Sequence, residues 1–288
     1  MSSGEAIEFP RSRGHELSAQ DVTVAYDGTD VVHQAAITIR PGEVTALVGP
    51  NGSGKSTLLR TLARLQRPRT ATLTLDDGET PADGLALTAR EFSRRVALLT
   101  QGRPTPSGLT VRDVVQFGRF PHRARWSRTD PGGADAVRRA LAMTDLDDLA
   151  DRGVEHLSGG QLQRVWLASC LAQETGVLLL DEPTTYLDLR YQVELLDLIR
   201  DLADDHGIAV GVVLHDLDQA AAVADRIALL RAGRIIADGR PEDVLTAERL
   251  TDTYGIRIDV DTDPPTGRLR TRAIGRHHAR TERLSTTS

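Results

Sequence analysis

Lysine, cysteine and aromatic residues are scarce in this chain of 288 residues. Aromatic residues make up 3%, so the core must consist mostly of leucine, valine, alanine and isoleucine. Cys170 is the only cysteine, which excludes an intramolecular disulfide, and the apolar run around it predicts a buried thiol. Lys55 is the only lysine, and every other basic side chain is arginine. A lone lysine predicts a position that requires a compact, flexible ammonium group.

Long apolar runs and a positive net charge are also missing. No run approaches the ~20 apolar residues that a helix needs to cross a bilayer, and residues 1–13 lack the apolar stretch of a secretory signal. We therefore expect a soluble, cytosolic protein that acts at a membrane only through another protein's transmembrane part. The net charge of -6, from 35 basic and 41 acidic residues, argues against a nucleic-acid partner.

Residues 49–57 have the spacing of a phosphate-binding loop, G-x-x-x-x-G-K-[ST]. An apolar run precedes them and a helix-forming run follows, which predicts a strand, a glycine-rich turn and a helix. Glycine permits positive φ, so backbone N–H groups can surround an anion beside the helix N-terminus. Lys55 is expected to reach the β- and γ-phosphates and Ser56 to bind Mg²⁺. The predicted nucleotide contacts of the loop are Gly49, Pro50, Asn51, Gly52, Ser53, Gly54, Lys55, Ser56 and Thr57.

The apolar run 177–180 ends in two adjacent carboxylates, Asp181 and Glu182. A buried parallel strand that ends in this way places Asp181 beside the phosphate loop, where it can hold Mg²⁺ through water. Glu182 is then free to orient and polarise the water that attacks the γ-phosphate. Together with the loop, this pair predicts a nucleoside triphosphate hydrolase.

Residues 157–161 read Leu-Ser-Gly-Gly-Gln and lead directly into a helical run. Small residues and exposed N–H groups at a helix start form a second anion site in the same chain. With the phosphate loop before it and the acidic strand after it, this pentapeptide resembles that of the ATP-binding subunits of ABC transporters, over about residues 17–260. The resemblance implies that two subunits pack head to tail and that each completes the ATP site of the other. The residues that would do so here are Ser158, Gly159, Gly160 and Gln161.

The same resemblance implies roles for four further residues. Gln101 matches the glutamine that reaches Mg²⁺ and the attacking water, and His215 matches the histidine that contacts the γ-phosphate. Tyr26 resembles the aromatic residue that stacks on adenine. Asp188 would cross the dimer interface, although Tyr186 nearby replaces a residue that is often small in the family. The expected cofactors are therefore ATP and Mg²⁺, with Glu182, His215 and Gln101 as catalytic residues and Ser56, Gln101 and Asp181 at the metal.

Three stretches, residues 118–122, 183–188 and 214–220, look like those of importers of iron siderophores, haem and cobalamin. Siderophore import is the nearest match. Asp218 departs from the asparagine expected at that position, and the arginine- and tryptophan-containing stretch 123–128 could be specific to the protein's own permease. None of these motifs belongs to a substrate pocket, so the substrate is inferred from resemblance alone.

The pattern of the whole chain predicts an α/β fold. We expect a P-loop NTPase core with a mixed parallel sheet, an N-terminal antiparallel β-subdomain and an inserted α-helical subdomain. Residues 1–16 are expected to form a flexible segment and residues 17–262 the ABC ATP-binding domain, with its helical part at about 103–172. Residues 263–288 are expected to hold the end of a C-terminal hairpin and a disordered tail.

The predicted function is the ATP-hydrolysing subunit of an importer, bound peripherally to the cytoplasmic face of the membrane. Its expected partners are a permease, a second copy of the chain in a homodimer and, indirectly, a substrate-binding protein. One alternative is a soluble ABC-type ATPase without a permease, although no tandem cassette, coiled coil or zinc module is visible. Another is an importer subunit for haem, cobalamin or another substrate. A non-hydrolysing regulatory module conflicts with the presence of Lys55, Gln101, Glu182 and His215 together.

Overall fold

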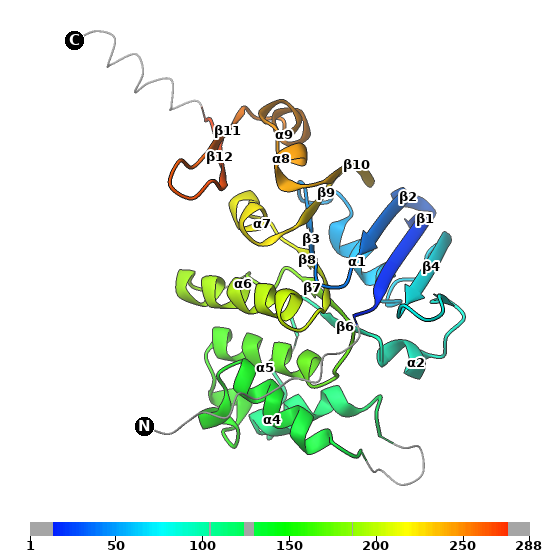
Figure 1. Cartoon of the computed structure of the whole chain (residues 1–288), viewed down its shortest axis with the longest axis vertical. Helices are drawn as coiled ribbons and strands as arrows, with labels where there is room; N and C mark the ends of the chain where they lie inside the picture. The colour runs from blue at the N-terminus through cyan, green and yellow to red at the C-terminus, as the bar shows by residue number, and fades with distance from the viewer. Residues whose placement is uncertain (1–13, 104, 124–129, 186, 276–288) are drawn as a thin grey trace, which may run out of the picture.

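The computed structural model describes residues 14–103, 105–123, 130–185 and 187–275. Tyr186, residues 124–128 of the arginine-rich stretch, most of the N-terminal segment and the end of the tail lie outside these ranges. The predicted α/β class is confirmed, because two sheets and their helices build the chain (Figure 1). Within the described ranges, no helix combines the length and the apolar character needed to cross a membrane.

The central sheet has six strands in the order β10-β9-β3-β8-β7-β6. Its parallel strands β3, β7 and β8 are buried at every residue, as their continuous apolar runs predict. Because β3, β6, β7 and β8 run parallel, their carboxyl ends share one edge of the sheet. The phosphate loop, Gln101, Glu182 and His215 all follow those ends. The strands are β3 (Val44–Val48), β6 (Val96–Leu99), β7 (Val177–Asp181), β8 (Ala209–Val213), β9 (Arg226–Arg231) and β10 (Arg234–Gly239).

A second, antiparallel sheet is built largely from the N-terminal part of the chain, in the order β2-β1-β4-β5. Strands β1 (Glu16–Tyr26) and β2 (Thr29–Ile39) meet at a turn where Asp27 and Gly28 both have positive φ, as predicted for Asp-Gly. Strands β4 (Thr70–Asp76) and β5 (Ala82–Asp83) extend the sheet. Since β1 begins at Glu16, that residue belongs to the sheet and not to a flexible segment.

Helix α1 (Lys55–Leu62) fixes the phosphate loop between the two sheets. Its Leu58, Leu59 and Leu62 are at most 1% exposed and pack in one cluster with side chains of both sheets. Burial of each such leucine contributes about 2 kcal/mol. The loop at the start of α1 is therefore held by the core behind it.

The chain between β6 and β7 contains helices and no strand within its described residues. Helix α3 (Val111–Gln116) is capped by Thr110, which forms a capping box with Asp113. Helices α4 (Gly133–Met143) and α5 (Gly159–Leu171) follow. Cys170 is buried in α5, and burial raises the pKa of its thiol, as expected for a core cysteine.

The remaining helices surround the sheet edge and the C-terminal hairpin. Helix α6 (Leu189–Asp204) follows β7, and the short α7 (Leu217–Val223) begins two residues after His215. The hairpin of β11 (Ile258–Thr262) and β12 (Leu269–Ala273) lies at the same end of the molecule as α9 (Figure 1). The described residues also form the helices α2 (Ala89–Ser93), α8 (Pro241–Val244) and α9 (Ala247–Tyr254).

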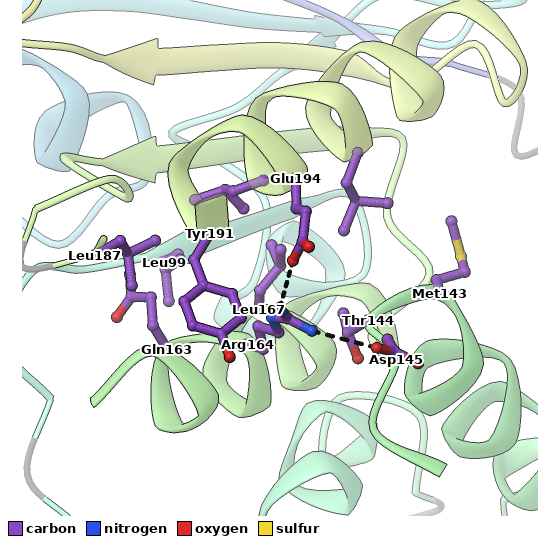
Figure 2. Close-up of a pocket in the computed structure, with 13 residues that line it drawn as sticks. Leu99, Met143, Thr144, Asp145, Gln163, Arg164, Leu167, Leu187, Tyr191 and Glu194 are labelled. Atoms are coloured by element: carbon purple, nitrogen blue, oxygen red, sulfur yellow. Dashed lines mark hydrogen bonds and ion pairs between the residues drawn. The ribbon is translucent and has the colours of Figure 1, made fainter. Parts of the chain in front are cut away.

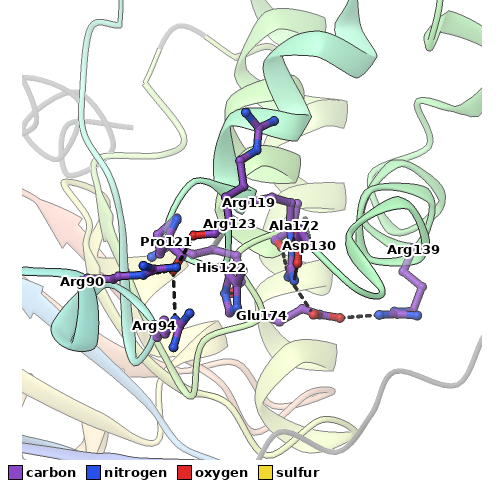
Figure 3. Close-up of polar contacts among 11 residues, drawn as sticks. Arg90, Arg94, Arg119, Pro121, His122, Arg123, Asp130, Arg139, Ala172 and Glu174 are labelled. Carbon is purple, nitrogen blue, oxygen red and sulfur yellow. Dashed lines mark hydrogen bonds and ion pairs between the residues drawn. The ribbon is translucent and has the colours of Figure 1, made fainter. Parts of the chain in front are cut away.

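Arg119, from the motif at residues 118–122, is buried in a polar cluster (Figure 3). Its guanidinium donates to both carboxylate oxygens of Asp130, at 2.8 and 2.9 Å, and to Glu174 at 2.8 Å. These hydrogen bonds hold the pKa of Asp130 below its usual value. Arg139 also pairs with Glu174, so the cluster joins the end of α3 to α4 and to the turn after α5. The arginine is thus a structural residue of the helical part.

Replacing this arginine should destabilise the protein. In Arg119→Met the carboxylates of Asp130 and Glu174 lose a buried partner, so we expect the free energy of unfolding to fall by about 3 kcal/mol. Arg112→Met is the matched control, because the Arg112 side chain is 50% exposed where that of Arg119 is 5% exposed. It should cost less than about 1 kcal/mol. Denaturant titration measures both, and equal losses would contradict the structural role of Arg119.

Candidate functional site

The phosphate loop connects β3 to α1 and has the backbone of an anion-binding turn. Gly49, Gly52 and Gly54 have φ of 144°, 75° and 99°. A Cβ atom on Gly49 would lie 2.1 Å from the carbonyl oxygen of Leu230 in β9, so only glycine fits against that strand. Helix α1 begins at Lys55, and its first N–H groups have no acceptor within the helix. The residues present therefore fit a phosphate group beside the helix start.

Lys55 lies inside the loop that precedes it. Its ammonium donates to the carbonyl oxygens of Gly49 at 2.8 Å and Pro50 at 3.0 Å, and the residue is 4% exposed. Burial lowers the pKa of Lys55, while the carboxylates of Glu182 and Asp181 act in the opposite direction. The ammonium is thus positioned at the loop, close enough to Asp181 at the end of β7 and to Glu182 after it to interact with both carboxylates.

Asp181 is fully buried at the end of β7 and has one oxygen to spare. Its Oδ2 accepts hydrogen bonds from Arg60 of α1 at 3.0 and 3.2 Å. Its Oδ1 has no hydrogen-bond partner among the described residues. A buried carboxylate oxygen without a donor fits a water molecule of a bound Mg²⁺, the role predicted for Asp181.

Glu182 is held between the other two predicted catalytic residues. Its Oε1 lies 2.7 Å from Nε2 of His215, and its Oε2 accepts from the amide nitrogen of Gln101 at 2.7 Å. Glu182 also has a positive φ of 53°, which is costly for a non-glycine residue and typical of functional sites. The ends of β6, β7 and β8 thus bring three residues together that are far apart in the sequence.

Tyr26 ends β1 on the N-terminal sheet and is 44% exposed. Its hydroxyl donates to the side-chain oxygen of Gln66 at 3.1 Å, in the segment after α1. This bond fixes the ring while a large part of it stays accessible. An accessible, oriented ring is suited to stacking on a base, the role predicted for Tyr26.

The pentapeptide at residues 157–161 forms the start of α5, away from the phosphate loop. Ser158 caps the helix: its hydroxyl accepts from the N–H of Gln161 at 3.2 Å, and the Gln161 side chain accepts from the N–H of Ser158 at 3.0 Å. The bond from Gln161 uses a lone pair of the Ser158 hydroxyl oxygen. The hydroxyl proton therefore stays available to donate to another group. In Figure 1, helices α5 and α1, which these two predicted anion sites precede, lie at different levels of the molecule.

An apolar pocket of about 170 Å³ separates α5 from α6 behind the pentapeptide (Figure 2). A Cβ on Gly160 would lie 3.2 Å from the ring of Tyr191, so a larger residue would require that ring to shift by a few tenths of an ångström. Arg164 lies over the same ring, at 4.4 Å, and pairs with Glu194 at 2.5 Å. Asp188 caps α6 by accepting from the N–H of Tyr191 at 3.0 Å. These contacts link the two helices whose first residues are predicted to face a second subunit.

Two residues that contact the site were missed from the sequence. Arg60 pairs with Asp181, and its signal was present, since it lies one helical turn after Ser56 on the same face of α1. Tyr254 of α9 is hydrogen-bonded by the backbone of Gly49, while burial raises the pKa of its hydroxyl to about 12. No local sequence pattern predicts that Tyr254 contacts the site, because its partner Gly49 lies 205 residues earlier in the chain.

This geometry defines a class of protein. A phosphate loop with a buried lysine, an acidic strand end with a spare carboxylate oxygen, and a glutamate held between glutamine and histidine form the site of a P-loop nucleoside triphosphatase.

Comparisons with known proteins place the chain more narrowly. The family model described as "ABC transporter" matches residues 32–185. The ferric enterobactin transport ATP-binding protein FepC of Escherichia coli is 42% identical over 251 residues, covering 87% of this chain and 91% of that protein. The hemin import ATP-binding protein HmuV of Rhodococcus jostii is 44% identical over 278 residues, with 92% of each chain covered. The chain therefore belongs to the ATP-binding subunits of ABC transporters, which bind and hydrolyse ATP, and the predicted family is confirmed.

A solved structure supports the same assignment. One chain of a structure described as "an inward-facing conformation of a putative metal-chelate type ABC transporter" superposes with a TM-score of 0.76. It is 26% identical in sequence, and the match covers 91% of this chain and 97% of that one. The probable siderophore transport ATP-binding protein YusV of Bacillus subtilis is a further relative, 42% identical with 86% of this chain and 89% of that protein covered.

Proposed function

We propose that this chain is the ATP-hydrolysing subunit of an importer for an iron(III)-siderophore type of chelate. The observation that carries the hydrolytic part is the Glu182 carboxylate, 2.7 Å from both Gln101 and His215 at the strand ends beside the phosphate loop. The import part rests on relatives such as FepC and YusV, whose names state siderophore transport.

In the proposed reaction, the phosphate loop binds ATP and Lys55 neutralises charge on the β- and γ-phosphates. Ser56 and Gln101 would ligate Mg²⁺, and Asp181 would hold one of its waters through the spare Oδ1. The ion would supply charge neutralisation at the phosphates. Glu182 orients and polarises the attacking water, while His215 fixes the Glu182 carboxylate and contacts the γ-phosphate.

The second half of each ATP site would come from a second copy of the chain. Ser158, Gly159, Gly160 and Gln161 of the partner would donate N–H groups and a hydroxyl to the γ-phosphate, and Asp188 would cross the interface. Such a dimer is stabilised by ATP and loosens once the γ-phosphate leaves, because only the triphosphate contacts both halves. A complete set of motifs in one chain is sufficient for a homodimer with two equivalent sites.

The remaining partners would be a membrane permease and, indirectly, a substrate-binding protein. We place the chain as a peripheral subunit at the cytoplasmic face of the membrane, where it would act on the permease. The limits of the ATP-binding domain at residues 17–262, and of its helical part at about 103–172, are likewise proposals.

Haem import is the second candidate, since HmuV is 44% identical to this chain. Uptake by cells distinguishes the two. In cells whose own copy is deleted, we expect radiolabelled ferric-siderophore uptake to be restored by the wild-type chain and not by Lys55→Ala, while growth on hemin stays unchanged. Arg138→Ala, at an exposed ion pair of α4, is the control and should restore uptake fully. Loss of hemin use in place of siderophore uptake would assign haem. Loss of neither would point to an importer of another substrate or to an ATPase without a permease, and co-purification with a membrane permease would separate those two.

A further inference from the structure

The C-terminal hairpin is tied to the helix that follows His215. Asp218, in the first turn of α7, accepts two hydrogen bonds through its Oδ1 atom. One comes from the backbone N–H of Thr271 in β12, at 2.7 Å, and the other from the Thr271 hydroxyl, at 2.8 Å. Asp218 is also the position at which the importer motif led us to expect asparagine. The contact therefore links an unusual residue beside the site to a hairpin 53 residues away.

The hairpin is a firm support for this contact. Ile258 is 4% exposed and belongs to the main core cluster, and its N–H donates to the hydroxyl of Thr251 in α9 at 3.0 Å. The turn is closed by Asp263, whose carbonyl accepts from Gly267 at 2.8 Å and whose carboxylate accepts from Thr266 at 2.6 Å. The hairpin is thus anchored in the core at Ile258 and closed by hydrogen bonds at the Asp263 turn. These two anchors hold Thr271 in place.

Helix α7 has little packing of its own to fix its position. It has seven residues, and its buried side chains are Leu217, Ala220 and Val223. Alanine buries little apolar area, so this face contributes less than a leucine-rich helix of the same length. Polar contacts of the first turn consequently have a large share in orienting the helix.

The first turn of α7 is held from two sides. Asp218 bonds to the hairpin on one side. On the other side Gln219 donates to the side-chain oxygen of Gln192 in α6 at 3.1 Å, and Gln192 in turn donates to the carbonyl of Leu187 at 3.2 Å. This path runs from the hairpin, through α7, to the segment between Glu182 and Asp188.

We propose that Asp218 and Thr271 are positioning residues for ATP hydrolysis, which hold the start of α7, and through it His215, against Glu182. The proposal rests on the proposed roles of His215 and Glu182. Two residues separate His215 from Asp218, and Asp216 caps the turn by accepting from the N–H groups of Asp218 and Gln219 at 2.8 and 3.0 Å. A shift of this turn moves His215 from its 2.7 Å contact, and a displacement of about 1 Å can lower turnover up to about 100-fold.

Two substitutions at one position separate the hydrogen bonds from the charge. Asp218→Ala removes the acceptor, so we expect kcat of the full-length chain with ATP and Mg²⁺ to fall roughly three- to thirtyfold, as for two lost hydrogen bonds. The KM for ATP should stay within about twofold, because the phosphate loop and Tyr26 are untouched. Asp218→Asn removes the charge but keeps Oδ1 as an acceptor, so it should retain most of the turnover.

Further variants control for folding and for local charge. Thr271→Val removes the hydroxyl but keeps the backbone N–H, so its kcat should fall by less than that of Asp218→Ala. Asp261→Ala removes an exposed carboxylate from the same hairpin without touching the Asp218–Thr271 contact, and its kcat should equal that of the wild type. Thermal unfolding of each variant shows whether a lower kcat reflects loss of folded protein.

The outcomes separate this proposal from the function on which it rests. Wild-type kcat in Asp218→Ala would overturn the positioning role, as would equal losses in Asp218→Asn and Asp218→Ala. A rise in the KM for ATP of Asp218→Ala as large as its fall in kcat would also overturn the positioning role, because the substitution would then act on ATP binding. If Glu182→Gln and His215→Ala, measured alongside, keep wild-type turnover, the proposed hydrolytic site itself is wrong. If they lose turnover while Asp218→Ala does not, only the positioning role fails.

Discussion

Glu182→Gln should leave ATP binding intact and slow hydrolysis by about 10²- to 10⁴-fold. The change replaces one carboxylate oxygen by an amide group of the same shape. Glutamine can still accept from Gln101 and meet His215, whose contacts with Glu182 are both 2.7 Å. What it lacks is the negative charge that polarises the attacking water. The loss should therefore appear in kcat, while the affinity for ATP stays close to that of the wild type.

The slow variant should also accumulate as a dimer when ATP and Mg²⁺ are present. If the start of α5 from a second copy completes the site, the dimer persists until the γ-phosphate is cleaved. Phosphate release measures the rate and light scattering measures the mass. Glu242→Gln is the matched control, since Glu242 in α8 has a side chain that is 60% exposed and pairs with Arg240. Wild-type hydrolysis by Glu182→Gln would show that another group activates the water.

Local patterns were enough to predict the elements that carry the site. The fully buried runs at β3, β7 and β8 have the composition of interior parallel strands, and such strands share one edge at their carboxyl ends. The strand pattern predicts Glu182 beside the phosphate loop, whereas the roles of Gln101 and His215, 114 residues apart, are implied by the resemblance to ABC transporter ATP-binding subunits. The structure shows which of these residues touch: Glu182 contacts both Gln101 and His215.

Contacts between remote elements could not be predicted in the same way. The bond of Asp218 to Thr271 and that of Tyr254 to Gly49 join segments whose separation in space depends on the packing of the whole C-terminal part. No period or motif in one segment specifies its partner in another. Arg60 differs, because its spacing from Ser56 was visible and only its pairing with Asp181 needed the fold.

The short helices α2 and α8 were missed for a different reason. With five and four residues, they are too short for an apolar period to emerge. Each has a terminal signal, a Thr88–Glu91 capping box in α2 and Pro241 at the first position of α8. Cap signals without a periodic run after them also occur in turns, so they do not suffice to predict a helix.

Lys55→Ala should abolish nucleotide binding, which we expect as an increase of at least about 100-fold in the dissociation constant for ATP. The ammonium lies within 3.0 Å of the Gly49 and Pro50 carbonyls and is 4% exposed. Its removal takes the ammonium donor from both carbonyls and the direct ammonium contact from the β- and γ-phosphates. Fluorescent ATP analogues measure the affinity, and full affinity in Lys55→Ala would overturn the assignment of the phosphate loop.

Lys55→Arg distinguishes a need for charge from a need for lysine. Arginine keeps the positive charge, but its planar, five-donor head is wider than an ammonium and cannot occupy the same buried space inside the loop. We therefore expect Lys55→Arg to bind ATP at least about tenfold more weakly than the wild type. If Lys55→Arg binds ATP as tightly as the wild type, a positive charge alone suffices at this position. The presence of the chain's one lysine there would then not reflect a requirement of the site.

The single lysine also allows the ammonium to be followed directly. Amine-selective reductive methylation can modify only the α-amino group and Lys55. Methylation beyond the α-amino group therefore measures the reaction of Lys55 alone. The α-amino group serves as the internal reference within the same molecule. ATP with Mg²⁺ should slow modification of Lys55 by about tenfold or more while leaving the reference rate unchanged, because a bound phosphate keeps the amine charged and shielded.

In Glu182→Gln the protection should outlast dilution of free ATP, since the triphosphate stays in place. A Lys55 that reacts at one rate with and without ATP would show that its ammonium does not contact the nucleotide.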